Sequence, residues 1–300
     1  PYVYRLYSYY GFSRHDNGVL FIAGFGSSLV FGTWAGPMAD KYGRKLNCIL
    51  YGITYILSCM TKHFNNFSIL MVGRLLGGFA TSILWSAFES WMVSEHNKAG
   101  HDPALIGSTF SLMIALNGLV AIASGFVAQW SVDLIGHPVA PFDVSALFLL
   151  FGTVFVYFSW SENYGDTSHD MVGQMKESIQ KIKNDKKIIY VGLQQSLFEG
   201  AMYTFVFMWT PTLDDGTEPI PHGLIFASFM VACSLGGTLF GILQAHMKVH
   251  HILRYVFIVA SCAMAVPMLT TNHTFIMGAF ICFEIAVGVF WPSIGTLRSI

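Results

Sequence analysis

Charged side chains are scarce in this sequence. Only 11% of its 300 residues are Asp, Glu, Lys or Arg, whereas about a quarter are charged in an ordinary soluble domain. The formal net charge is −1, and no basic stripe with interleaved aromatics appears, so nucleic acid is not an expected partner. The five cysteines lie within or beside apolar segments without metal-ligand spacing, and we interpret them as small buried residues.

Motifs of catalysis are also missing. The sequence has no phosphate-cradling loop, no nucleophile elbow and no spacing typical of a catalytic Ser/Cys–His pair. His246, His250 and His251 have metal-compatible spacing, but no Cys or acid completes a ligand set, so an interfacial loop is the favoured interpretation. We therefore expect neither an enzyme nor a cofactor or metal site.

Apolar segments are what this chain has in quantity. Its hydrophobic fraction is 54% and its mean hydropathy is +0.54, and stretches of about 18 or more apolar residues can each cross the bilayer core. These features predict an all-α polytopic membrane protein in contact with a lipid bilayer. The predicted spans are 18–37, 46–62, 67–93, 104–131, 142–160, 188–211, 221–246, 252–270 and 274–295.

The ends of the sequence suggest a piece of a longer protein. It starts at Pro1 with no signal-peptide pattern and stops soon after an apolar segment. The tyrosine-rich residues 1–10 are typical of the aromatic end of a helix that leaves the membrane.

The segment 36–45, Gly-Pro-Met-Ala-Asp-Lys-Tyr-Gly-Arg-Lys, is the most specific motif in the chain. It resembles the signature loop between the second and third helices of the major facilitator superfamily at nearly every position, with Met38 in place of Leu. The resemblance implies a two-bundle fold of which helices two to ten of twelve are present here. Residues 1–160 would form the N-terminal bundle, beginning with the tail of helix one and containing helices two to six, and 188–300 the C-terminal bundle, containing helices seven to ten.

The distribution of lysine and arginine predicts the orientation. With the signature loop in the cytoplasm, alternation places twelve of these residues inside and three outside, and Arg74 lies within a span. The inside group is Lys41, Arg44, Lys45, Lys98, Lys176, Lys181, Lys183, Lys186, Lys187, Lys248, Arg254 and Arg298, and the outside group is Arg5, Arg14 and Lys62. Two N-x-S/T sequons, beginning at Asn66 and Asn272, also fall on the outside.

The longest polar stretch is 161–187. Within it Met171, Met175, Ile179 and Ile182 recur at helical spacing, with lysines on the other face. This pattern predicts an amphipathic cytoplasmic helix that links the two bundles. A calmodulin-type target helix is the alternative interpretation.

The signature resemblance also implies roles for residues near the inner face. In the superfamily an acid at the cytoplasmic end of the fourth helix pairs with the arginine of the loop, and the aspartate of the loop contacts helix eleven. Carried over, Glu95 would pair with Arg44 and Asp40 would close the inner gate, with Gly43 supplying the turn. We interpret these residues as gate parts. The full set is Gly36, Asp40, Gly43, Arg44, Lys45, Glu89 and Glu95.

Arg74 is the one base that the sequence places deep in a span, where charge is costly and therefore points to function. Arg74, Gly78, Thr81, Trp85 and Glu89 recur at steps of three or four residues and predict one stripe on span 67–93. A guanidinium suits a tetrahedral oxyanion because it offers several donors and stays charged. Neutralisation by a carboxylate or by carbonyls of helix one is the structural alternative.

Two acids are also predicted inside spans, Glu199 and Glu284. Gln195, Glu199 and Tyr203 form a polar stripe at spacings of four residues. A buried carboxyl can carry a proton, which makes either acid a candidate for proton coupling. A hydrogen-bonded structural acid and a direct substrate contact remain as alternatives.

Several segments resemble the eukaryotic molybdate-anion transporter family of this superfamily. They are residues 1–4, 10–13, 20–28, 82–95, 139–143 and 161–165. The resemblance implies a plasma-membrane transporter for molybdate or a similar oxyanion. One arginine balances only one of the two negative charges of molybdate. We therefore expect further stabilisation of the anion by residues of helix one or by helix dipoles, or a co-transported proton. The alternatives are a non-transporting receptor or scaffold on the same fold and a proton-coupled efflux carrier for organic solutes.

Overall fold

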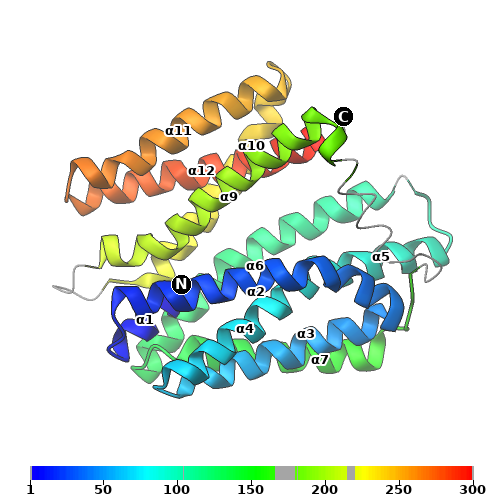
Figure 1. Cartoon of the computed structure of the whole chain (residues 1–300), viewed down its shortest axis with the longest axis horizontal. Coiled ribbons are helices and arrows are strands. Elements are labelled where there is room, and N and C mark those ends of the chain that lie inside the picture. Colours follow the sequence, from blue (N-terminus) through cyan, green and yellow to red (C-terminus); the bar gives the residue numbers. More distant parts are fainter. Residues whose placement is uncertain (1, 104, 166–179, 181, 215–219, 299–300) are drawn as a thin grey trace. The chain divides into compact units, whose positions relative to one another are not determined.

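The computed structural model describes the chain except for residues 1, 104, 166–179, 181, 215–219 and 299–300 (Figure 1). The described residues form helices and connecting turns, with no strand among them. In chain order the elements are α1 Tyr2–Tyr9, α2 Arg14–Tyr42, α3 Arg44–Met60, the 3-10 turn η1 Thr61–His63, α4 Phe67–Leu84, α5 Ala87–Lys98, α6 Leu105–Ile135, α7 Ala140–Ser159, α9 Lys186–Leu213, α10 His222–Gln244, α11 Val249–Leu269 and α12 His273–Arg298.

Each predicted span except 67–93, which two helices share, coincides with one helix, and the all-α prediction is confirmed. Seven helical segments in the described part of the chain are long and apolar enough to cross a membrane, counting α4 and α5 as one. The other two predicted spans are α3, which has only 17 residues, and α9, whose middle carries Gln194, Gln195 and Glu199. The predicted amphipathic helix of the linker falls mostly on residues 166–179 and 181, outside the described residues.

Contacts divide the chain into two units. The first in chain order, here called the N unit, comprises 2–114 and 130–174; the other, the C unit, comprises 115–129 and 175–300. Each is described by itself below. The predicted division at 161–187 stays a prediction.

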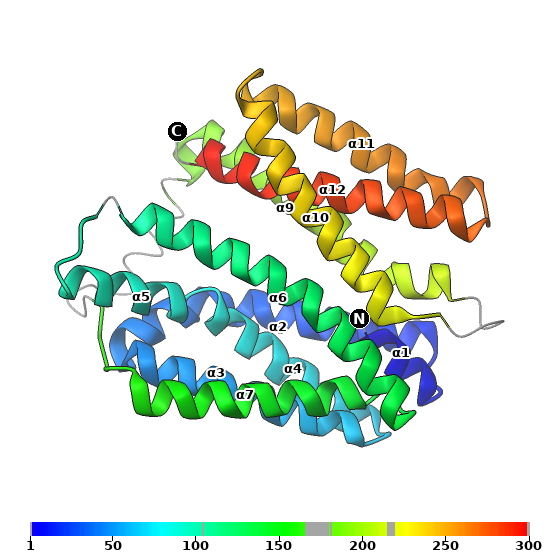
Figure 2. The same ribbon diagram turned by 180° about the vertical axis from the view of Figure 1, so that it is seen from behind.

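Small residues let the helices of the N unit approach closely. α2 packs along α4, and α3 packs against both α4 and α7 (Figure 2). A Cβ at Gly78 would collide with the Ser27 hydroxyl and the Gly24 carbonyl, so this crossing requires glycine. Ser27 Oγ donates to the Leu75 carbonyl at 3.0 Å, which adds the interhelical hydrogen bonding typical of membrane bundles.

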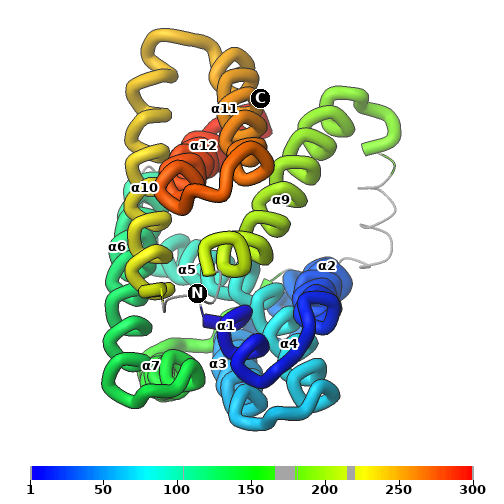
Figure 3. The backbone as a smooth tube through the Cα atoms, turned by 90° about the vertical axis from the view of Figure 1, so that its left-hand side faces the viewer, coloured from blue at the N-terminus to red at the C-terminus, as the bar shows by residue number. Residues whose placement is uncertain are grey.

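The C unit is built around α12, which packs against α10 and α11 (Figure 3). Gly236 of α10 and Gly288 of α12 touch backbone to backbone, and a Cβ at either would collide with the other helix. Beside this crossing, the ring of Phe198 from α9 stacks on that of Phe290, with centroids 3.9 Å apart. Aromatic packing therefore fixes α9 against α12.

The second contact of α10 is with the segment 115–129 of α6. Gly125 and Gly223 meet backbone to backbone, and Gln129 Oε1 accepts a hydrogen bond from the Gly223 amide at 3.0 Å. Small residues thus allow close helix contacts at two positions of α10, Gly223 and Gly236.

The predicted span 67–93 is interrupted. α4 ends at Leu84 and α5 begins at Ala87, because Ser86 has a non-helical backbone conformation and its hydroxyl bonds the carbonyls of Ser82 and Ile83. Serine hydroxyls that bond the preceding turn compete with the helical pattern. The stripe predicted from Arg74 to Glu89 is therefore broken, and Glu89 belongs to a separate helix.

Both sequon asparagines cap helices. The Asn66 side chain accepts hydrogen bonds from the amides of Ser68 and Ile69 at the start of α4. Asn272 does the same for Thr274 and Phe275 at the start of α12. N-capping explains the presence of asparagine at both positions without modification.

Candidate functional site

Arg74 lies on the α2-facing side of α4 with its charge unmatched by an acid in the described part of the chain. Its Nε donates to the Leu20 carbonyl at 3.1 Å, and its guanidinium carbon lies 4.9 Å from the Phe21 ring centroid and 6.0 Å from that of Phe25. The terminal nitrogens rest against Gly24, where any Cβ would collide with them. These contacts hold the guanidinium in place through one N–H and leave its terminal donors available.

The contacts of Arg74 can be compared with the alternative that a carboxylate or the carbonyls of helix one neutralise it. A carbonyl does bond Arg74, as that alternative requires, but it belongs to α2 and not to helix one. Aromatic faces stabilise a cation without neutralising it. These contacts therefore position the Arg74 guanidinium without neutralising its positive charge.

Lys62 is a second buried cation, which the sequence analysis placed in an outside loop. It lies in η1 with only 3% of its surface exposed. Its Nζ donates to the Tyr7 hydroxyl at 3.1 Å and lies 5.5 Å from the Tyr7 ring centroid, while its backbone carbonyl accepts a hydrogen bond from Tyr10 Oη at 2.6 Å. The interpretation of Arg74 as the only buried base was therefore wrong.

Burial and, to a smaller extent, the charge of Arg74 lower the pKa of Lys62 to about 7, against a smaller opposing effect of Cys59. A lysine in this state exchanges its proton near neutral pH. The signal in the sequence was the position of Lys62 two residues after the end of an apolar helix, in a chain whose tyrosine-rich residues 1–10 could cover it.

Glu199 has a partner on its own helix. Gln195 Nε2 donates to Glu199 Oε1 at 2.7 Å, as expected for residues four apart. Tyr203 lies one turn further along α9 and interacts with the Glu199 charge. Both Gln195 and Glu199 are partly exposed, so this stripe has solvent-facing area.

Glu284 is different. It lies on α12 with 6% of its surface exposed, and no hydrogen bond or ion pair joins it to a described residue. Cys233 of α10 is near enough to interact with its charge, and the glycine crossing lies one turn further along α12. An acid in this setting is favoured in its neutral form.

The signature segment is a helix corner, not an extended loop. α2 continues through Tyr42, Gly43 alone separates it from α3, and Gly43 has φ 110°, as expected for a glycine turn. Lys45 opens α3, and Gly36 lies within α2. The ion pair between Asp40 of α2 and Arg44 of α3, four residues apart, spans this short corner.

The pairing predicted for Arg44 is wrong. Its Nη2 and Nε bond one carboxylate oxygen of Asp40 at 2.7 and 3.0 Å, and its Nη1 donates to the Ser90 carbonyl at 3.2 Å. Glu95 instead accepts from Asn163 Nδ2 at 3.0 Å and lies 3.6 Å from Lys98 Nζ. Asp40 and Arg44 are four residues apart on either side of Gly43, so Asp40 is the nearer acid in the sequence and Glu95 of α5 the more distant one.

Residues 161–165, here called the strap, cover this corner. Glu162 caps α3 by accepting hydrogen bonds from the amides of Lys45 and Leu46 at 2.8 and 3.1 Å. The Asn163 carbonyl accepts from the Arg44 amide, and the Gly165 amide donates to the Asp40 carbonyl, both at 3.0 Å. In the sequence these residues indicate a family resemblance and the start of the linker, and their contacts with the signature segment were not predicted.

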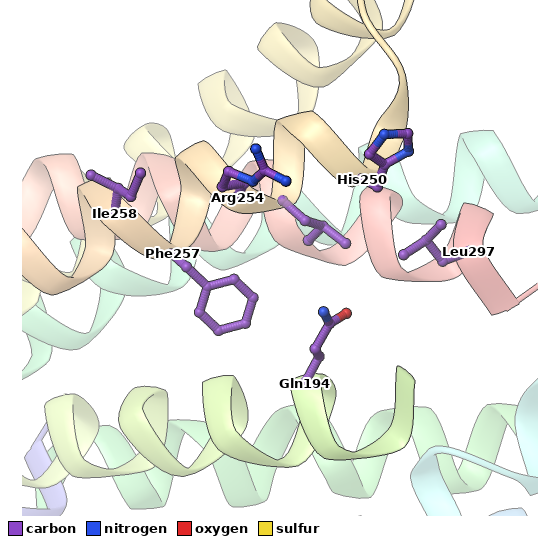
Figure 4. A pocket seen from close by; sticks show the side chains of 7 residues that line it. Gln194, His250, Arg254, Phe257, Ile258 and Leu297 are labelled. Carbon is purple, nitrogen blue, oxygen red and sulfur yellow. The ribbon is translucent and has the colours of Figure 1, made fainter. Parts of the chain in front are cut away.

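Each unit contains a cleft within the part of the chain that the structure describes. One, of about 550 Å³, borders the corner in the N unit and is lined by Arg44, Glu89, Ser90, Asn97 and Tyr164 among others. The second, of about 450 Å³, lies in the C unit, where Gln194 of α9 faces Arg254 and Phe257 of α11 (Figure 4).

Comparisons with known proteins agree with this architecture. The family model MFS_5, described as sugar transporters with 12 transmembrane segments, matches residues 1–289. The molybdate-anion transporters of Xenopus tropicalis and Xenopus laevis are 31% and 32% identical to the chain, over 99% of it and 68% of their own length. A crystal structure of the nucleoside transporter NupG superposes with a TM-score of 0.78 at 14% identity, covering 97% of this chain and 75% of NupG.

Proposed function

Because this chain belongs to the molybdate-anion transporter family of the major facilitator superfamily, we propose that it carries molybdate, or a similar tetrahedral oxyanion, by alternating access. The observation that carries the proposal is Arg74, whose guanidinium is oriented by a carbonyl and two aromatic rings but meets no carboxylate in the described part of the chain. Terminal N–H donors without an acid partner suit an oxyanion. The chain is a multi-pass membrane protein and not an enzyme.

Direction and location are part of the same proposal. The signature corner faces the cytoplasm, the protein resides in the plasma membrane, and transport is uptake. The twelve-to-three distribution of cationic residues supports this orientation. Lys62, although counted outside, is buried and does not alter the imbalance.

Protons are the proposed coupling ion. Glu284 is the stronger candidate in the C unit because it is buried and unpartnered among the described residues, whereas Glu199 already accepts a hydrogen bond from Gln195. A carboxyl that is neutral in apolar surroundings can take up and release a proton as its surroundings change.

Uptake into liposomes tests the proposal. The full-length protein is reconstituted, and labelled molybdate is supplied with an excess of sulfate, glucose or no competitor, with an inward proton gradient imposed or withheld. We expect molybdate to enter faster with the gradient, sulfate to compete partly and glucose not at all. Glucose competition would favour the sugar-transport description of the matched family model, and protein-independent molybdate entry would overturn the proposal.

A further inference from the structure

A divalent oxyanion at Arg74 leaves one negative charge to be matched. The sequence pattern did not identify a second base for the site, but the structure places Lys62 beside the aromatic side chains that contact Arg74. Lys62 Nζ bonds the Tyr7 hydroxyl, and the Tyr7 ring packs edge-on against Phe21 with centroids 6.5 Å apart. Phe21 is the ring beneath the Arg74 guanidinium. The two cations therefore flank one aromatic cluster and interact electrostatically.

No acid neutralises this pair within the described residues. The charged and titratable groups around Lys62 are Tyr7 and Tyr10 on the α1 side, Cys59 at the end of α3, Arg74 on α4, and His63 next to it in η1. Asp143 of α7 also lies at this end of the unit, but its carboxylate is bonded to His63 Nε2 at 2.6 Å. A buried ammonium group and a half-buried guanidinium without a counter-ion are an unfavourable arrangement unless an anion joins them.

We propose that Lys62 is the second cation of the oxyanion site and that it takes up a proton when the anion binds. This proposal rests on the proposed function, since it assumes an oxyanion at Arg74. Three geometric features support it: the Lys62 amine is oriented by a tyrosine hydroxyl, the Arg74 guanidinium is held by a carbonyl, and no described acid pairs with either group.

Electrostatics gives the direction of the linkage. Without the anion, burial and Arg74 lower the Lys62 pKa to about 7, so at pH 8 roughly nine in ten Lys62 side chains are neutral. A bound anion favours the charged form and raises that pKa. Each binding event at pH 8 therefore draws a proton from solution, and the bound complex is nearer to neutrality.

Calorimetry of molybdate binding to the purified full-length protein tests this directly. Titrations at pH 8 in two buffers of different ionisation enthalpy give the number of protons taken up per anion bound. We expect close to one for the unmodified protein. Lys62→Arg keeps a charge that does not titrate, so molybdate should still bind while proton uptake disappears.

Lys62→Gln completes the test. At pH 6.5 it should bind molybdate about tenfold more weakly, in keeping with loss of a charge-assisted hydrogen bond, and show no proton uptake at pH 8. Lys248→Gln, at the start of α11, is the matched control and should behave as the unmodified protein. Thermal unfolding of each variant confirms that the protein measured is folded.

The outcomes separate the two proposals. Unmodified protein that binds no molybdate would overturn the proposed function. Molybdate binding with proton uptake retained in Lys62→Arg and Lys62→Gln would overturn the role of Lys62 alone. Proton uptake in the binding step reports on Lys62, whereas proton dependence found only in net transport reports on Glu199 and Glu284.

Discussion

In the N unit the ionisable groups at the candidate sites are cations, the buried Lys62 and the half-buried Arg74, and in the C unit they are acids, the buried Glu284 and the half-buried Glu199. Neither set is paired with its opposite within its own unit in the described part of the chain. Buried charges that persist without local compensation are costly. This contrast supports the proposal that the N unit binds the anion and that the C unit carries the coupling proton.

The two units also position these groups differently. Arg74 and Lys62 are oriented by aromatic rings and by single hydrogen bonds, which fix a cation while leaving donors free. Glu284 instead lies one turn from a glycine crossing whose backbones touch, where little can move. A binding site needs donors that remain open, whereas a proton carrier needs mainly an apolar setting.

Removal of the Arg74 charge should have the largest effect on this contrast. Arg74→Ala is expected to lower molybdate uptake by about a hundredfold, the upper range for losing hydrogen bonds to a charged group. Initial uptake rates in liposomes measure it. Arg254→Ala, which removes an exposed arginine from the C unit, is the matched control, and equal rates for the two variants would refute the binding role of Arg74.

The acids should differ from each other. Glu284→Gln is expected to reduce gradient-driven uptake about tenfold, a size within the range of coupling free energies between two sites, with counterflow exchange of molybdate preserved. Glu199→Gln should do less, because Gln195 already satisfies one of its oxygens. Flux in the double variant that still follows the pH gradient would rule out both acids as coupling groups.

The pH dependence of folding examines Lys62 separately. The pKa of Lys62 is lowered from its ordinary value of 10.5 to about 7 in the folded protein, so between these values the unfolded state binds more protons and stability rises with pH. The slope contributed is at most about 1.4 kcal/mol per pH unit. Unfolding measured from pH 7 to 9.5 should show a flatter curve for Lys62→Met, and an unchanged slope would argue against a titrating Lys62.

The smallest expected effect concerns the strap. Glu162→Ala removes the side-chain cap of α3 and should lower stability by about 1 kcal/mol, seen as a reduced unfolding midpoint in detergent. Glu89 is an exposed acid of the same unit, so Glu89→Ala is a suitable control. Identical midpoints for the two variants would show that the cap contributes nothing measurable.

The sequence was sufficient to locate the helices and the buried charges within them. Arg74 and Glu284 could be recognised because a charged residue in a long apolar segment stands out by pattern alone. Lys62 could not, since it lies just outside such a segment and its burial depends on Tyr7 and Tyr10, some 50 residues earlier. Periodicity carries no information about contacts of that range.

Local chemistry explains the other differences. The break after Leu84 follows from serine hydroxyls that bond the preceding turn, and such competition changes a helix without changing its hydropathy. Arg44 pairs with Asp40, which lies four residues earlier on the other side of the Gly43 corner, whereas the expected partner Glu95 came from analogy. The roles of the strap in capping α3 and covering the corner needed coordinates, because its partners lie more than 100 residues away.

The strap has a mechanical consequence. Its last residue, Gly165, donates to the Asp40 carbonyl, and a Cβ at that glycine would collide with the Asp40 side chain. A displacement of Gly165 therefore requires the C-terminal end of α2 to move as well. Gly43 is the only residue between α2 and α3, so such a movement would change the angle between these two helices.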